Sequence, residues 1–228
     1  MGGFIEVEQA DGGSNRGYLA ETAERGAPGV VVIQEWWGLQ DQITGTCDRL
    51  AAAGYHALAP DLYGGAVAPY HDSAAAEAAM NALDVMAATE GAVASAARRL
   101  AANGAKVGLT GFCLGGLVTV LGAIRVPGLA AAVCFYGLPS PEMGASGDIA
   151  IPFQAHFANH DDWCTPAAVD AFEAGLGADA ELHRYDAKHG FMNEQQPSIH
   201  DAAAARIAGQ RMLDFWRRHL AQPGGGGR

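Results

Sequence analysis

The segment "TGFCLGG" (residues 110–116) places a cysteine between glycines directly after an apolar run. Gly111 and Gly115 stand two residues before and two residues after Cys113. A strand that turns sharply into a helix strains its central residue and brings the flanking positions too close together for side chains. The pattern therefore predicts a strand at 105–112, a tight bend that lifts the thiol above the sheet, and a helix to about residue 123.

This predicted bend suits Cys113 to nucleophilic chemistry. The helix dipole at an N-terminus favours a thiolate, and the backbone N–H of Leu114 is a candidate donor to an oxyanion. The alternative is a small buried thiol, which we accept for Cys47 and Cys134, whereas Cys164 stays open as a residue bordering the site. A core thiol needs no pair of glycines, and the spacing G-x-C-x-G-G differs from that of a dinucleotide-binding loop.

Short apolar runs alternate with Ala-rich segments along the rest of the chain, which predicts a mainly parallel sheet with helices on both faces. Expected strands are 29–35, 55–62, 105–112, 129–137, 151–159 and 181–186, and expected helices include 41–53, one or two within 73–102, one after Pro166, and 199–220. "FIEVEQA" and "RGYLAET" near the N-terminus could form a hairpin at one edge. We expect a single domain over 1–222 and a flexible Gly-rich tail at 223–228.

Functional groups in such sheets gather at the carboxyl ends of the strands. The residues just past the predicted strands are Glu35-Trp36-Trp37, Asp61, Cys113, Tyr136-Gly137, Asp161-Asp162 and His189. A free thiol has a pKa of about 8.5 and needs a base at neutral pH. His189 is the candidate base, and Asp162 is expected to orient its imidazole.

Composition excludes several other functions. The formal charge is −11, from 14 basic and 25 acidic residues, which argues against binding to nucleic acid or to anionic membranes. The sequence has no secretory signal and no uninterrupted apolar run of membrane-spanning length. The scattered cysteines indicate reduced thiols in a cytoplasmic protein and no zinc site. His156 and His160 are four residues apart, but they flank a strand end, so we expect no metal there.

Six segments together resemble the dienelactone hydrolase family of the α/β-hydrolase fold, in the order expected for that family over about residues 28–220. They are "QEWWGL" (34–39), "APDLYGG" (59–65), "GFCLGG" (111–116), "FYG" (135–137), "DDWCTP" (161–166) and "KHGF" (188–191).

The resemblance implies a Cys-His-Asp triad of Cys113, His189 and Asp162. Asp161 competes for the acid position, and Asp162 is preferred because the family's acid stands four residues before a proline, here Pro166. The resemblance also implies two further roles: Glu35 would assist activation of the thiol, and the backbone N–H of Trp36 would be the second oxyanion donor.

The sequence departs from the family where members that cleave dienelactone carry arginines for the substrate carboxylate. Gly64-Gly65 and Asn193 stand at those positions, and both are neutral. A buried carboxylate without a partner is costly, so we expect a neutral ester or lactone as substrate. Trp36 would share an aromatic pocket with the expected substrate-binding residues, Trp37, Tyr136, Trp163 and Phe191.

The expected activity is hydrolysis through an acyl-enzyme, with no cofactor. Two alternatives are a non-catalytic binding protein and a thiol redox sensor on the same scaffold. A monomer is the default expectation and a dimer is possible. The sequence does not identify the physiological substrate.

Overall fold

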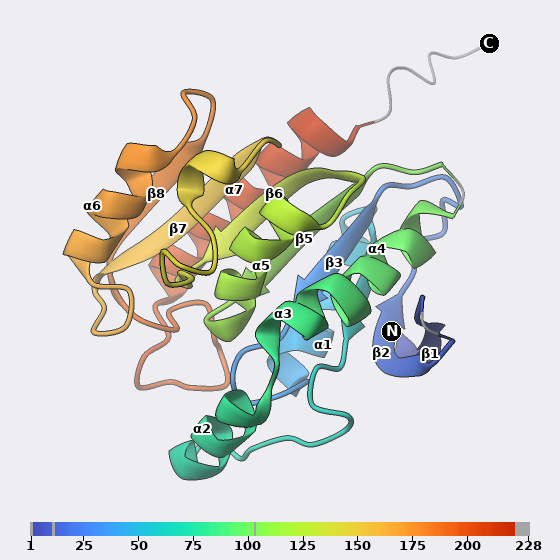
Figure 1. Ribbon diagram of the computed structural model, residues 1–228, viewed down its shortest axis with the longest axis horizontal. Coiled ribbons are helices and arrows are strands. Elements are labelled where there is room, and N and C mark those ends of the chain that lie inside the picture. Colours follow the sequence, from blue (N-terminus) through green and yellow to red (C-terminus); the bar gives the residue numbers. More distant parts are fainter. Residues whose placement is uncertain (1, 11, 103, 222–228) are drawn as a thin grey trace.

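The computed structural model describes residues 2–10, 12–102 and 104–221 (Figure 1). These residues contain one eight-stranded sheet in the order β1-β2-β4-β3-β5-β6-β7-β8. The strands are β1 (Gly3–Glu8), β2 (Ser14–Ala20), β3 (Gly29–Ile33), β4 (His56–Pro60), β5 (Val107–Phe112), β6 (Leu129–Phe135), β7 (Phe153–His160) and β8 (Glu181–Lys188). Strands β3 to β8 are parallel to one another, whereas β1 and β2 form an antiparallel hairpin at one edge, in which β2 pairs antiparallel with β4. The predicted sheet and hairpin are confirmed, and the predicted tail at 223–228 lies outside the described residues.

Helices cover both faces of the sheet (Figure 1). They are α1 (Asp41–Ala52), α2 (Ser73–Ala82), α3 (Val85–Ala88), α4 (Ala94–Ala101), α5 (Leu114–Arg125), α6 (Pro166–Gly175) and α7 (Ala202–Leu220). One buried cluster joins α1 and α7 to the sheet, and a second joins α4, α5 and α6 to the opposite face. This arrangement is the expected α/β-hydrolase fold, with two apolar cores separated by the sheet.

The central strands are buried along their whole length because both of their faces are covered. Every residue of β3, "GVVVI", is buried, as is every residue of β5, "VGLTGF". Continuous buried runs of this kind are typical of parallel sheets. They form the two strands that end shortly before Glu35 and Cys113.

The region 73–102 divides into more pieces than the sequence indicated. Leu83 is extended and ends α2, and Asp84 then caps α3 by accepting a hydrogen bond from the N–H of Ala87 at 2.9 Å. A short π-helix, Thr89–Val93, joins α3 to α4. Because only Ala76 of α2 is buried, this helix projects from the body of the molecule below the strand ends (Figure 1).

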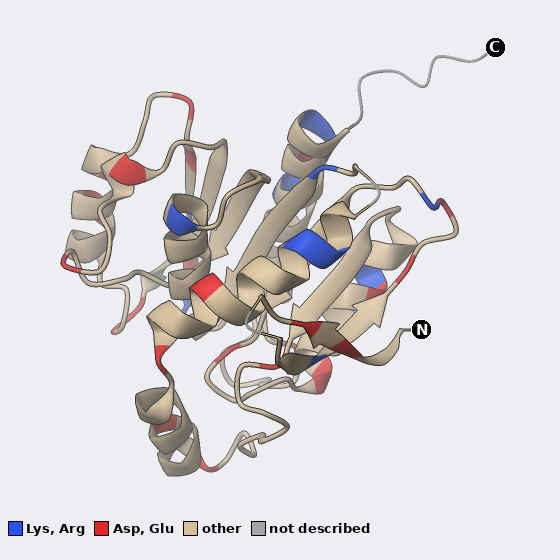
Figure 2. Ribbon diagram, turned by 45° about the vertical axis from the view of Figure 1, so that its right-hand side comes forward, with Lys and Arg blue, Asp and Glu red and all other residues tan. Residues whose placement is uncertain are grey.

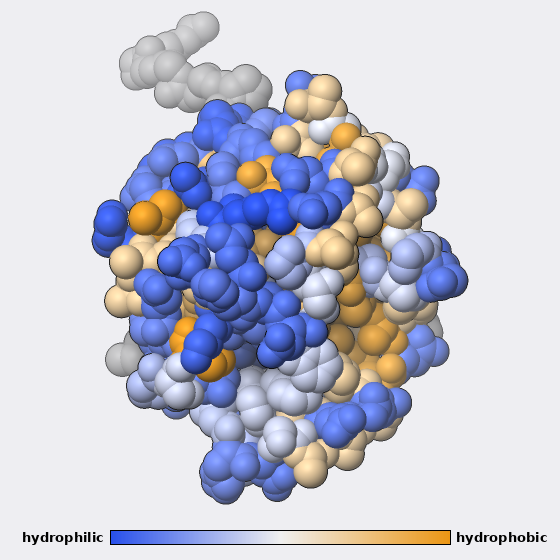
Figure 3. Space-filling model, turned by 90° about the vertical axis from the view of Figure 1, so that its left-hand side faces the viewer, coloured by the Kyte–Doolittle hydropathy of each residue, from blue (hydrophilic) through white to orange (hydrophobic). Residues whose placement is uncertain are grey.

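Charged residues are dispersed over the molecule. Basic residues are separated by acidic and uncharged residues in the view of Figure 2. The face that carries α6 and β8 is hydrophilic over much of its area, and hydrophobic residues gather toward the right-hand side of the view (Figure 3). Within the described ranges, none of the helices has the length and apolarity needed to cross a membrane.

Candidate active site

Cys113 occupies the strained bend that the sequence predicts. Its backbone has φ 56° and ψ −116°, a conformation that costs a residue other than glycine about 1–3 kcal/mol. A Cβ added at Gly111 would lie 2.2 Å from the carbonyl oxygen of Gly115, and one added at Gly115 would lie 2.5 Å from that of Ile33. Both contacts are far below van der Waals distance, so these glycines are required for the strand to turn into α5.

The carboxylate beside His189 belongs to Asp161. Its Oδ2 lies 2.8 Å from Nδ1 of the imidazole, and its Oδ1 accepts hydrogen bonds from the N–H groups of Trp163 at 2.8 Å and Cys164 at 2.9 Å. The neighbouring Asp162 is exposed. The prediction that Asp162 orients the imidazole is therefore wrong, because the turn after β7 directs residue 161 inward.

Asp161 and His189 stabilise each other's charged forms. Burial by itself raises the pKa of Asp161, but its hydrogen bonds outweigh burial and hold that pKa below the ordinary value. Burial lowers the pKa of His189, but its interactions with Asp161 and Cys113 outweigh that effect and raise the pKa to about 10. Nδ1 is committed to Asp161, whereas the buried Nε2 has no hydrogen-bond partner among the described residues. Nε2 is thus the nitrogen available to the thiol.

Glu35 is a buried carboxylate held by neutral donors. Its Oε1 accepts a hydrogen bond from the hydroxyl of Tyr136 at 3.1 Å, and its Oε2 accepts one from the amide of Asn193 at 2.7 Å. Burial raises the pKa of Glu35, while Asn193, His189 and Tyr136 oppose that rise. The sequence marked Glu35 as a candidate but gave no sign of either partner.

A cavity of about 240 Å³ opens beside Cys113 and His189. Trp36 and Trp37 line it with their rings 5.0 Å apart, and Trp163 lies 5.6 Å from Trp36. Trp163 is 66% exposed and forms part of the mouth. The cavity wall also contains Glu35, Met80, Gly190, Gln196 and Ile199. Met80, Gln196 and Ile199 were missed because α2 and the loop after β8 reach the site only in the folded chain.

Two of the expected pocket aromatics do not line this cavity. Tyr136 and Phe191 are fully buried and contact each other with ring centroids 5.3 Å apart. Their role as substrate-binding residues is therefore wrong in this structure. Tyr136 instead supports the site from behind, through Glu35 and through an edge contact with His189 at 5.0 Å.

The two candidate oxyanion donors approach the thiol differently: Leu114 follows Cys113 directly in the chain, and Trp36 lines the same cavity. Leu114 is the first residue of α5, so its N–H has no carbonyl partner within the helix. Trp36 lines the cavity with Cys113. Their roles in binding an oxyanion stay predictions.

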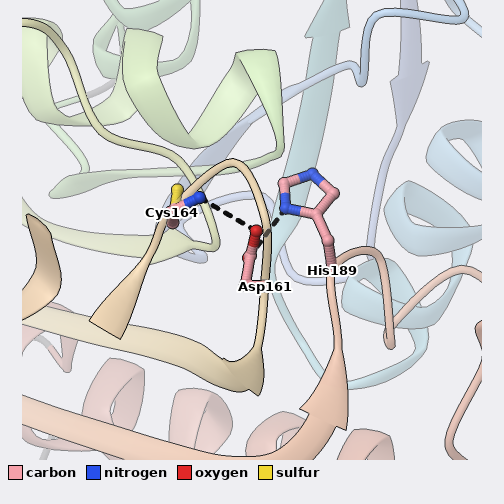
Figure 4. A group of neighbouring side chains, drawn as sticks. All are labelled: Asp161, Cys164 and His189. Atoms are coloured by element: carbon pink, nitrogen blue, oxygen red, sulfur yellow. Dashed lines mark hydrogen bonds and ion pairs between the residues drawn. The ribbon is translucent and has the colours of Figure 1, made fainter. Parts of the chain in front are cut away.

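Asp161, Cys164 and His189 also form a group of potential metal ligands, with one donor atom from each within 4.8 Å of the others (Figure 4). Nδ1 and Oδ2 already bond to each other, so a metal would have to displace this ion pair. Burial also raises the pKa of the Cys164 thiol, which disfavours the thiolate that a metal binds. The site chemistry is explained more directly by the ion pair.

The fold and the residues at its strand ends define an α/β-hydrolase-type protein with a thiol, an imidazole and a carboxylate at one site. The sequence model of the dienelactone hydrolase family matches residues 16–220. The chain belongs to the dienelactone hydrolase family.

Individual relatives and a solved structure are similar to most of the chain. "Protein usf" of Aquifex pyrophilus is 33% identical over 234 residues, covering 96% of this chain and 100% of the relative. The "Putative carboxymethylenebutenolidase" of Escherichia coli K12 is 33% identical and covers 84% of this chain and 77% of the relative. The crystal structure of a "Putative Dienelactone Hydrolase" from Klebsiella pneumoniae superposes with a TM-score of 0.84 at 26% identity, covering 96% of this chain and 99% of the other.

Proposed function

We propose that this protein hydrolyses neutral esters or lactones with Cys113 as nucleophile, His189 as base and Asp161 as the residue that orients the imidazole. The single observation that carries the proposal is the 2.8 Å contact of Asp161 with Nδ1 of His189, in a site whose cavity also contains Cys113. This arrangement leaves Nε2 free to exchange a proton with the thiol and with the leaving group.

In the proposed reaction, Nε2 of His189 already holds the thiol proton, as the raised pKa of the imidazole favours, and Sγ of the thiolate bonds to the substrate carbonyl carbon. The N–H groups of Leu114 and Trp36 would stabilise the resulting oxyanion. Nε2 then returns the proton to the alcohol oxygen as the C–O bond breaks and the thioester remains. Water attacks this thioester, loses a proton to the imidazole and releases the acid and the thiol. Every proton moves through one nitrogen, and no cofactor enters the balance.

The preference for neutral substrates rests on the charges around the cavity. Among the described residues that line it, Glu35 is acidic and none is Lys or Arg. Asn193 is fully buried and already bonded to Glu35. The charge of the His189 imidazole is already paired with Asp161. An anionic substrate would therefore lie near the Glu35 carboxylate with no Lys or Arg to offset its desolvation.

The test is turnover of p-nitrophenyl acetate by the wild type and by Cys113→Ala. We expect a burst of p-nitrophenol from the wild type and loss of both burst and turnover in the variant. Cys47→Ala, which removes a buried thiol elsewhere, is the matched control. Turnover that survives in Cys113→Ala would falsify the mechanism. A hemisuccinate ester hydrolysed as fast as its neutral analogue would contradict the substrate preference alone.

A further inference from the structure

A second cavity, of about 520 Å³, lies between α1 and α7. Its volume is within the range of roughly 300–1,000 Å³ that small-molecule sites occupy. No residue lines both this cavity and the one beside Cys113. It is therefore a separate space, on the sheet face covered by α1 and α7.

The floor of the second cavity is apolar. It is formed by Leu50, Phe112, Met192, Met212 and Leu213. Small residues of α7 keep the space open. A Cβ added at Gly209 would meet nothing within 4 Å, although glycine is unfavourable inside a helix by about 1 kcal/mol. An apolar chain could be buried here without any rearrangement of the backbone.

Two polar side chains on the wall lack partners in the described structure. Gln42 is only 2% exposed, yet its side-chain amide makes no hydrogen bond with a described residue. Arg206 on α7 is exposed at the rim of the cavity and makes no hydrogen bond or ion pair within the described part of the chain. Buried polar groups are normally paired, so the amide of Gln42 at the cavity wall is available to the polar group of a bound molecule.

The charge at this cavity favours an anion. Arg49 also lines the cavity, but it forms an ion pair with Glu194 at 2.9 Å. The positive charge of Arg206 therefore has no acidic partner among the described residues. A guanidinium and an amide N–H match the two oxygens of a carboxylate. We propose that the cavity between α1 and α7 binds a small amphipathic carboxylate, with its chain on the apolar floor and its head at Arg206 and Gln42.

The experiment is calorimetric titration of decanoate into protein labelled at Cys113 with N-phenylmaleimide, which blocks the first cavity. Cys47, Cys134 and Cys164 are buried, so labelling should be confined to Cys113. The inference does not depend on catalysis, and its failure would leave the proposed hydrolysis unaffected.

The structure predicts the following pattern of affinities. The labelled wild type and the control Arg99→Ala, which removes an exposed arginine of α4, should bind decanoate equally. Arg206→Ala should weaken binding at least tenfold, because a hydrogen bond to a charged group is lost. Gly209→Phe should fill the cavity and abolish binding, with its fold verified by circular dichroism.

Three results would overturn the proposal. They are no binding of decanoate by the labelled wild type at millimolar concentration, unchanged binding by folded Gly209→Phe, and equal affinity for decanoate and decanol. If Gly209→Phe does not fold, Arg206→Ala decides alone: an affinity within threefold of the control refutes the carboxylate site.

Discussion

Replacing Asp161 by asparagine should impose the wrong tautomer on His189. The backbone N–H groups of Trp163 and Cys164 both donate to Oδ1 of Asp161, so asparagine should keep its oxygen there and turn its NH₂ group toward Nδ1. An NH₂ group next to Nδ1 requires a lone pair on that nitrogen and places the proton on Nε2. The imidazole could then no longer accept the thiol proton.

The expected loss in kcat is about 10⁴-fold, as a wrong imidazole tautomer causes in Ser-His-Asp enzymes, or about 5.4 kcal/mol in activation free energy. The assay is hydrolysis of p-nitrophenyl acetate by Asp161→Asn and by Asp162→Asn, both verified by urea unfolding. Asp162 is exposed, so its variant should stay within twofold of the wild type. A larger loss in Asp162→Asn, or a loss below tenfold in Asp161→Asn, would refute the assignment of the acid.

Three further predictions concern the bend, a buried histidine and the cavity mouth. Gly115→Ala places a Cβ 2.5 Å from the backbone oxygen of Ile33, and should lower the free energy of unfolding in urea by about 1–3 kcal/mol. Gly3→Ala is its control, because the Cβ added there meets open space. Equal urea midpoints for the two variants would contradict the packing argument. Burial lowers the pKa of His156 well below its ordinary value. Below about pH 6.5 the imidazole of His156 binds a proton in the unfolded chain but not in the folded one. The free energy of unfolding should therefore fall by up to about 1.4 kcal/mol for each unit by which the pH is lowered in this range. His156→Gln should reduce that slope between pH 5 and 6.5, and an unchanged slope would assign it to other groups. Trp163→Ala should raise KM for aryl esters by about two- to tenfold, which corresponds to the loss of one aromatic contact. Its kcat and its urea midpoint should stay unchanged. A loss confined to kcat would instead place the indole in the chemical step.

Much of the fold could be predicted because its determinants are local in the sequence. Each central strand is a continuous apolar run, and the glycines around Cys113 are needed for steric reasons that involve only neighbouring backbone. The order of strands and helices then places Glu35, Cys113 and His189 together at the carboxyl ends of the strands, since parallel strands end on the same side of the sheet. These inferences need no knowledge of contacts between distant segments.

The supports of Glu35 could not be predicted because they come from distant parts of the chain. Asn193 lies 158 residues away in sequence and Tyr136 lies 101 residues away. Nothing in either local sequence distinguishes a buried amide or phenol that bonds a carboxylate from one that bonds the backbone. The same limit explains why Tyr136 was expected in the pocket, since an aromatic residue at a strand end can face the cavity or the core.

The choice between Asp161 and Asp162 depended on local geometry at the ends of β7 and β8 that residue counting ignores. Ala158 of β7 pairs with Tyr185 of β8, but His160 pairs with Lys188, so β8 advances three residues while β7 advances two. The extra residue lies in β8, so this bulge re-aims the side chains of β8 that lead to His189. Which of the two aspartates faces the imidazole is set in the turn after β7, about which the spacing to a proline carries no information. Two backbone N–H bonds to Oδ1 then fix Asp161 in its inward position, and moving Asp162 into that position would break both. Local hydrogen bonding in the turn after β7, and not distance along the chain, selects the acid.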